Sequence, residues 1–278
     1  MEVIHVAGAL LSAALHAGWN AAVKASPRPA EAMATQMLMS ALFCLPFLLW
    51  TGFPDTAAWK WIAASALTNT IVVTALLKAY ELAGFGIVYP VVRAISVVLV
   101  VPMAALLAGD RLGLGGLAGI ALIVLSLGFL ARSTGRDRSI PPRAILWIVV
   151  GGLATAVYVM CDAQGARAAG SPWAYGFVVS ITNAAAMWWR NRHLGSPIGL
   201  VRANWRVATP TAMASVASYL LILWVWSVAP IAPSSALRDT SSVFAILIAI
   251  VWLREPLTAS RVLAVLLAAA AVPLLRLA

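Results

Sequence analysis

Two arginines, Arg93 and Arg238, lie inside apolar stretches that are long enough to cross a membrane. They are 145 residues apart, and the same offset pairs Ser96 with Ser241. Further pairs at this offset are Val98 and Val243, Ala104 and Ala249, Asp110 and Glu255, Leu112 and Leu257, and Leu122 and Leu267. A charge in the hydrocarbon core of a bilayer costs about 2.5–3.5 kcal/mol even on lenient scales. A chain that places such charges at matching points of two repeats is expected to use them, so the pair predicts a solute site between two membrane repeats.

The composition indicates an integral membrane protein. Hydrophobic residues make up 63% of the 278 residues and charged residues 10%, whereas a soluble domain has about 45–50% apolar and about 25% charged residues. The net charge of +10 does not indicate nucleic-acid binding, because most Lys and Arg fall between the apolar segments, where loop charge sets membrane orientation. Cys44 and Cys161 fall within apolar segments, so we interpret them as small core residues without a disulfide.

The lengths of the apolar segments predict ten transmembrane helices, since about 20 apolar residues span a bilayer. The predicted helices cover residues 3–25, 31–51, 58–83, 86–108, 112–131, 144–168, 172–190, 204–229, 231–253 and 258–276. A basic linker loop over 132–143, RSTGRDRSIPPR, separates a first repeat (1–131) from a second (144–278). Five helices in each repeat give the repeats opposite orientations, as in many secondary transporters. The predicted fold is therefore an all-α membrane protein of two inverted five-helix repeats.

Loop charge predicts which side of the membrane each link faces. Twelve Lys and Arg lie near the links between helices 1–2, 5–6, 7–8 and 9–10. Five are assigned to the other side, namely Lys60, Lys78, Arg111, Arg167 and Arg276. Cytoplasmic loops carry an excess of Lys and Arg, so both termini are expected outside the cell.

The first helix carries a polar stripe in the run GALLSAALHAGWNAAVK. Its members recur every four residues and share one helix face, and they are Gly8, Ser12, His16, Asn20 and Lys24. One interpretation is helix packing, because small and polar residues line helix contacts in membranes. The alternative is that Trp19 and Asn20 line a cavity, with His16 nearby as a proton carrier.

Helices 4, 6 and 9 contribute the remaining candidate site residues. Helix 4 places Tyr89, Arg93 and Ser96 on one side, and helix 9 places Ser234, Arg238 and Ser241 at corresponding positions, with Asp239 beside them. Helix 6 adds Tyr158 and Asp162. Each charge at such depth needs a partner.

Two interpretations of these four charges stay open. In the first, Arg93 or Arg238 pairs with Asp162 or Asp239 in a purely structural network whose formal charge is zero. In the second, one arginine stays available to clamp a carboxylate or phosphate on a solute, because the guanidinium fork matches such groups.

Other features have structural interpretations. Asp110 and Glu255 follow helices 4 and 9 and favour the start of the next helix. Six tryptophans near predicted helix ends fit an aromatic belt, and they are Trp50, Trp59, Trp61, Trp188, Trp189 and Trp205. Trp224 and Trp226 lie deeper, and one of them is expected to face the cavity. The chain has no GxxxxGK[ST], HExxH or GxSxG motif, so an ATP-driven motor and an enzyme are both disfavoured.

Four runs resemble the EamA family of the drug/metabolite transporter (DMT) superfamily. They are HAGWNAAVK, YPVVRAISVVLVVPMAALLAGDRL, VYVMCDAQGARAAGSP, and ALRDTSSVFAILIAIVWLREPLTASRVLAVLLAAAAVPLLRL. The resemblance extends over nearly the whole chain as two tandem EamA repeats. It implies ten helices, a central cavity and export or exchange of small metabolites by alternating access. It also implies termini in the cytoplasm, opposite to the loop-charge prediction.

These observations predict a secondary transporter of a small zwitterionic or anionic metabolite, such as an amino acid, in the inner (plasma) membrane. Arg93 and Arg238 are expected to bind its carboxylate, and Asp162 or Asp239 to meet an amine or hold an arginine. Tyr89, Trp19, Asn20 and Tyr158 are expected to shape the wall. No cofactor or metal is expected, and a proton is the candidate coupling ion. The alternatives are efflux of lipophilic cations, which would depend on Asp162 or Asp239, and a scaffold or receptor that transports nothing.

Overall fold

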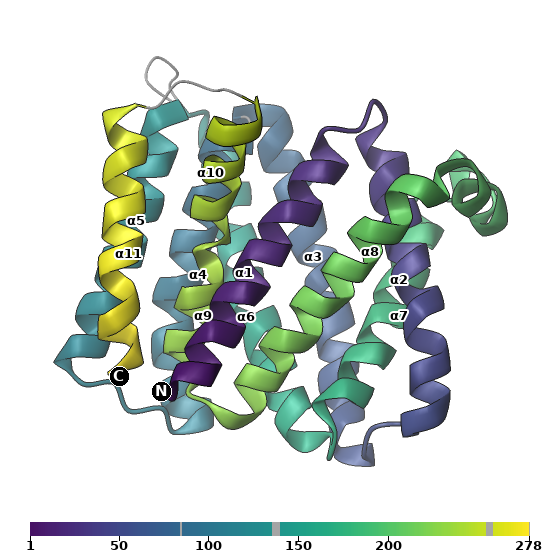
Figure 1. Cartoon of the computed structure of the whole chain (residues 1–278), viewed down its shortest axis with the longest axis horizontal. Coiled ribbons are helices and arrows are strands. Elements are labelled where there is room, and N and C mark those ends of the chain that lie inside the picture. Colours follow the sequence, from purple (N-terminus) through teal and green to yellow (C-terminus); the bar gives the residue numbers. More distant parts are fainter. Residues whose placement is uncertain (84, 135–139, 254–257, 278) are drawn as a thin grey trace.

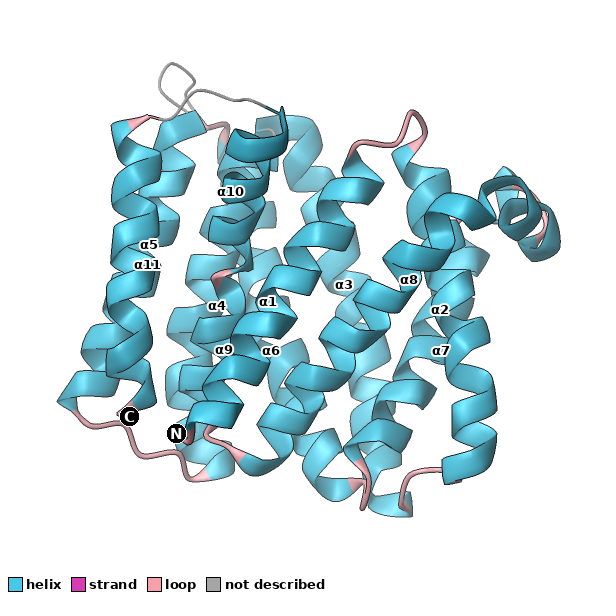
Figure 2. Cartoon of the chain, viewed as in Figure 1, coloured by secondary structure: helices cyan, strands magenta, loops and turns pink. Residues whose placement is uncertain are grey.

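The computed structural model describes residues 1–83, 85–134, 140–253 and 258–277, and these form helices joined by short links, without a strand (Figure 2). The helices of the first half are α1 (Val3–Lys24), α2 (Pro29–Thr51), the short η1 (Thr56–Ala58), α3 (Trp59–Ala83), α4 (Phe85–Ala108) and α5 (Leu114–Thr134). Those of the second half are α6 (Pro142–Ala168), α7 (Pro172–Arg190), the short η2 (Arg192–Leu194), α8 (Pro197–Val228), α9 (Ile231–Asp239), α10 (Ser241–Leu253) and α11 (Ala259–Arg276).

Most of these bounds lie within a few residues of the predicted ones, and proline accounts for several helix starts. Pro29, Pro142, Pro172 and Pro197 each occupy the first turn of their helix, where the missing N–H has no intrahelical partner to lose. The largest shift is in α8, which begins seven residues before the predicted 204. Its early start lengthens the helix to 32 residues, more than a bilayer requires.

The predicted helix over 231–253 is divided. The structure ends α9 at Asp239 and begins α10 at Ser241, with a turn at Thr240. The pieces have 9 and 13 residues, so neither alone spans a bilayer. Within the described residues, eight helices are long and apolar enough to cross a membrane, namely α1 to α6, α8 and α11. The count of ten spans therefore stays a prediction.

Helices of the two halves pack against each other throughout the bundle (Figure 1). Helix α3 packs against α6, and α8 packs against α1. Helices α2 and α7 meet, as do α5 and α11, and α4 lies against both α6 and α9. A Cβ on Gly152 of α6 would stand 2.5 Å from Cγ2 of Ile95 on α4, so this glycine permits the close approach of the two helices.

Both termini lie at one end of the bundle, where several links hold neighbouring segments together (Figure 1). The Met1 amine donates to the carbonyl of Arg276 at 2.6 Å. Arg167 of α6 donates from Nε to the carbonyl of Trp226 (2.9 Å) and from Nη2 to that of Ala229 (2.8 Å). The Met1 link thus joins the two halves at this end, and the Arg167 links join α6 to the end of α8 within the second half.

Asp110 fastens the same end, but not as predicted. Its Oδ2 accepts from the backbone N–H of Ile231 (2.6 Å) and of Ala232 (3.1 Å), at the start of α9. The carboxylate therefore interacts with the N-terminal end of α9, in the other half of the chain, and not with the following helix α5. The reason is that the 109–113 link places Asp110 beside the free N–H groups at the start of α9. Its repeat counterpart, Glu255, and residues 135–139 of the linker lie outside the described residues.

Six tryptophans were predicted to lie near helix ends in an aromatic belt, and those that are exposed fit this prediction. Trp50, Trp59, Trp189 and Trp205 are 83%, 43%, 63% and 53% exposed, as expected for a belt at the membrane interface.

The predicted side of one loop charge is wrong. Helix α3 ends at Ala83 and Lys78 lies near that end, so Lys78 is on the same side as the twelve Lys and Arg residues of the more basic links. The correction strengthens the imbalance of loop charge, and the orientation of the termini stays a prediction.

Candidate functional site

Arg93 forms an ion pair that joins the two halves of the chain. Its Nη1 donates to Oδ1 of Asp239 on α9 at 2.9 Å. Tyr89, one turn earlier on α4, accepts from Nη2 at 3.3 Å, and its ring lies 5.2 Å from the guanidinium carbon. The spacing of four residues puts Tyr89 and Arg93 on one helix face. The Arg93 side chain keeps 17% of its exposure, so the guanidinium is not fully enclosed.

Helix α1 contributes His16, Trp19 and Asn20 to the surroundings of this pair. His16 Nε2 lies 3.5 Å from Nη2 of Arg93, and its ring meets Trp19 edge to face at 5.2 Å. Asn20 donates to the carbonyl of His16 at 2.8 Å, so one of its groups is used within α1. A proton on His16 Nε2 would face the guanidinium, which favours a neutral ring that accepts from Arg93. The geometry therefore speaks against His16 as the proton carrier.

Arg238, the repeat counterpart of Arg93, has different surroundings. Its guanidinium lies over the ring of Trp226, 5.6 Å from the centroid. Among the described residues no carboxylate lies within ion-pair distance, and the buried Nε has no hydrogen-bond partner. Asp239 is the next residue along α9, but successive side chains of a helix point about 100° apart. The carboxylate that is closest in sequence therefore points to Arg93 instead.

The turn between α9 and α10 collects further polar groups without partners. Ser241 and Ser242 begin α10 and are 2% and 3% exposed, and Ser235 of α9 is 4% exposed. The hydroxyls of all three have no hydrogen-bond partner among the described residues. The first N–H groups of a helix also lack intrahelical acceptors. Arg238 and the start of α10 thus carry several buried donors that lie close together in the sequence.

Asp162 is bound by hydroxyl groups and not by an arginine. Ser65 of α3 donates to Oδ1 at 2.6 Å and Tyr175 of α7 at 3.0 Å, while Tyr219 of α8 donates to Oδ2 at 2.8 Å. Tyr158, one turn earlier on α6, lies near the carboxylate. Asp162 is 0% exposed. Of the pairings left open by the sequence, the structure therefore has Arg93 with Asp239.

Two tyrosines that bind Asp162 were not predicted from the sequence. Tyr175 and Tyr219 were not named as candidates, and neither was Ser65. A signal existed, because all five tyrosines of the chain lie within helices. Three of them surround Asp162, and the other two, Tyr80 and Tyr89, act on Arg93. Tyrosines within apolar helices thus mark the buried charges here.

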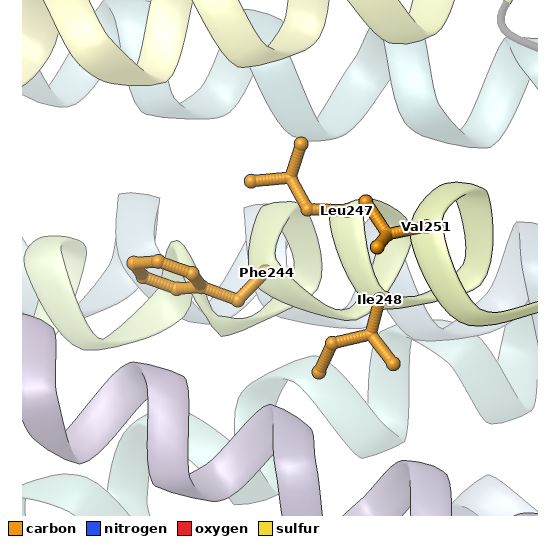
Figure 3. Close-up of a pocket in the computed structure, with 4 residues that line it drawn as sticks. All are labelled: Phe244, Leu247, Ile248 and Val251. Atoms are coloured by element: carbon orange, nitrogen blue, oxygen red, sulfur yellow. The ribbon is translucent and has the colours of Figure 1, made fainter.

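The pocket in Figure 3 is not the predicted polar cavity. It has a volume of about 490 Å³ and is lined by Phe244, Leu247, Ile248 and Val251 of α10. Its lining is apolar and includes neither Arg93 nor Arg238. This pocket suits hydrocarbon and not a charged solute. Access to the arginines is supported instead by the partial exposure of Arg93 and Arg238, which lie among buried neighbours.

No group of three or more His, Cys, Asp and Glu residues that could hold a metal ion occurs in the part of the chain that the structure describes. The free cysteines Cys44 and Cys161 are buried, and they lie on different helices without a disulfide between them. The buried polar groups of the described residues include arginine, carboxylate, hydroxyl and amide groups.

An apolar helical bundle with internal charges is typical of a multi-pass membrane protein whose buried polar groups have a function. Residues 3–132 match the model of the EamA-like transporter family. The match confirms the resemblance carried by the first two runs. The second half lies outside the matched residues.

The solved structures support the fold. One, described only as "Crystal structure of protein", has a TM-score of 0.73 and 18% sequence identity, covering 98% of this chain and 95% of that chain. At this identity the likeness concerns the fold alone. No curated protein sequence matches the chain.

Proposed function

We propose that this protein is a secondary transporter of small anionic or zwitterionic metabolites, such as amino acids, with Arg238 as the group that binds the carboxylate. The EamA family indicates a DMT-type membrane transporter and not an enzyme. The observation that carries the substrate class is the contrast between the two arginines. Arg93 is neutralised by Asp239, whereas Arg238 has no carboxylate among the described residues. A buried guanidinium without a counterion favours an anionic ligand.

The break between α9 and α10 supports the same substrate class. In transporters built from repeats, substrate sites lie at interrupted helices, where helix N-termini point at anionic groups. Here the start of α10 places the unpaired hydroxyls of Ser241 and Ser242 three and four residues after Arg238. Trp19, Asn20, Tyr89 and Tyr158 would form the wall around the bound solute.

The second candidate, efflux of lipophilic cations, has less support. It requires a carboxylate that is open to the solute. Asp239 is engaged by Arg93 at 2.9 Å, and Asp162 accepts three hydroxyl donors at 2.6–3.0 Å while fully buried. Neither carboxylate is available without a rearrangement, so the amine of a zwitterion would also have to use hydroxyls and backbone carbonyls.

We propose that the two halves are inverted repeats and that the solute site opens to each side of the membrane in turn. The packing of the helices supports this proposal. Helix α3 of the first half packs on α6 of the second half, and α8 of the second half packs on α1 of the first half in the same way. The links of Asp110 to α9 and of Arg167 to the end of α8 support a state that is closed at the end carrying the termini. Transport would require these links to break.

The test is flux in proteoliposomes with labelled probes of different charge. L-Glutamate and gluconate serve as anions, L-threonine as a zwitterion and tetraphenylphosphonium as a lipophilic cation. We expect protein-dependent flux of an anion or the zwitterion, and none of the cation beyond protein-free vesicles. Flux of tetraphenylphosphonium alone, abolished by Asp162→Asn, would establish the second candidate and refute the first.

A further inference from the structure

Asp162 sits at a meeting point of four helices, and only Tyr158 among its neighbours also belongs to the proposed solute site. Ser65 reaches it from α3, Tyr175 from α7 and Tyr219 from α8, while Tyr158 and Cys161 flank it on α6 itself. The first of these helices belongs to the first half of the chain and the others to the second. The carboxylate therefore joins the two halves, as the Arg93–Asp239 pair does, but without a cation.

The arrangement is built to hold the tyrosines in place. A Cβ on Gly165 of α6 would overlap the ring of Tyr175, so only glycine lets this ring lie against α6 and reach Asp162. Tyr175 is 0% exposed and Asp162 is 0% exposed. A carboxylate removed from water is costly in its ionised form unless it is paired or hydrogen-bonded.

A proton is the cation that fits this site. The three hydroxyl oxygens lie 2.6, 2.8 and 3.0 Å from the carboxylate oxygens, which are direct hydrogen-bond distances with no ion between them. A proton can be taken up by turning one hydroxyl from donor to acceptor, because hydroxyl groups do both. One O–H bond then forms on the carboxylate, and no helix has to move apart.

We propose that Asp162 is the proton-binding site of this transporter, and that a proton on Asp162 and an anionic solute at Arg238 are carried together in the same direction. The inference rests on the proposed function. With Asp162 ionised, the charges of Arg93, Arg238, Asp162 and Asp239 sum to zero. With Asp162 protonated they sum to one positive charge, which a monoanion at Arg238 balances.

Tyr158 connects the two places, because it engages Asp162 and also lies within electrostatic range of Arg238 on α9. Burying an unbalanced charge is unfavourable in a low-dielectric interior. Each occupant therefore raises the affinity of the other, which is what couples two ligands thermodynamically.

The first experiment measures protonation without any solute. Infrared difference spectra of the purified protein are recorded as a function of pH, and the C=O stretch of a protonated carboxyl is followed. We expect a titrating signal that is absent in Asp162→Asn and present, at a shifted frequency, in Asp162→Glu. An identical titrating signal in wild type and Asp162→Asn, or no titrating carboxyl at all, would overturn the assignment.

The second experiment measures coupling in proteoliposomes that contain a pH-sensitive dye, with L-glutamate and gluconate as the monoanions. In the wild type, we expect an acid-outside gradient to drive uptake and each anion to carry protons inward. Asp162→Asn should lose gradient-driven accumulation but keep anion exchange at equal pH, which also demonstrates that the variant is folded. Proton movement opposite to the anion, or gradient-driven uptake unchanged in Asp162→Asn, would refute the coupling.

The two experiments also distinguish the inference from the proposed function. Failure of the proposed function appears as an absence of flux with every probe while the Asp162 carboxyl still titrates in the infrared. Failure of the inference appears as Arg238-dependent anion flux that ignores the pH gradient. A sodium gradient replacing the proton gradient as the driving force would likewise overturn the proton site.

Discussion

Arg93 and Arg238 occupy matching positions in the two halves of the chain but have different surroundings. Arg93 pairs with Asp239 at 2.9 Å and donates to Tyr89 at 3.3 Å. Arg238 lies over Trp226 at 5.6 Å, and its Nε has no hydrogen-bond partner in the described chain. The difference arises because the second half has a carboxylate at 239, where the first half has Ala94. One arginine is thereby fixed in the structure, and we propose that the other binds a ligand.

The largest effect is expected from Arg238→Gln. Removing the guanidinium should reduce anion flux at low probe concentration by at least about tenfold, because one charged partner of a buried pair contributes roughly 2–5 kcal/mol. Thermal stability should not fall, since no ion pair is broken. Flux in proteoliposomes and melting of the detergent-solubilised protein measure the two quantities.

Arg206→Gln is the matched control for this variant. Arg206 also lies over a tryptophan, Trp205, at 5.6 Å, but on the exposed surface of α8. It should leave flux unchanged. Equal losses in Arg206→Gln and Arg238→Gln would mean that net charge, and not the buried position, matters.

Asp239→Asn should produce the reverse pattern. It leaves Arg93 buried without its counterion, which costs about 3–5 kcal/mol for a buried pair and should lower the melting temperature by several degrees. Anion binding should persist, because Arg238 is intact. The exchanged pair Arg93→Asp with Asp239→Arg should recover part of the lost stability. Unchanged melting of Asp239→Asn would contradict the structural role of the pair.

A smaller effect is expected from the double variant Ser241→Ala with Ser242→Ala. Each hydroxyl would donate one neutral hydrogen bond to the anion, worth about 0.5–1.5 kcal/mol, so anion affinity should fall severalfold. Ser227→Ala is the control, because its hydroxyl already donates to the carbonyl of Trp224 at 2.7 Å. Affinity is obtained from the concentration dependence of flux, and an equal loss in the control would remove the α9–α10 turn from the site.

The sequence predicted most helix bounds and marked the two arginines as candidates. Apolar length and proline positions define the helices, as Pro172 does at the start of α7, and these are local properties. The offset between Arg93 and Arg238 marked both residues before any contact was known. The pairing of Arg93 with Asp239 was one of the alternatives that the sequence left open.

The rest depended on how helices rotate against each other. The surroundings of Asp162 come from four helices, and the partners Ser65, Tyr175 and Tyr219 lie up to 97 residues away in the chain. The break at Thr240 also has no proline or glycine beside it to mark where one helix ends and the next begins. Asp110 capping α9 instead of α5 is likewise a contact between halves. Spacing along one helix carries no information on such contacts.

The central claim is that Arg238 is an open anion site inside the bundle, and ligand-dependent melting tests it most directly. Purified wild type and Arg238→Gln are melted over a concentration series of amino acids, organic acids and amines. A ligand that binds the folded state raises the melting temperature with its concentration. We expect a carboxylate-bearing compound to raise it in the wild type and in Arg206→Gln, but not in Arg238→Gln. An equal rise in wild type and Arg238→Gln would contradict the assignment.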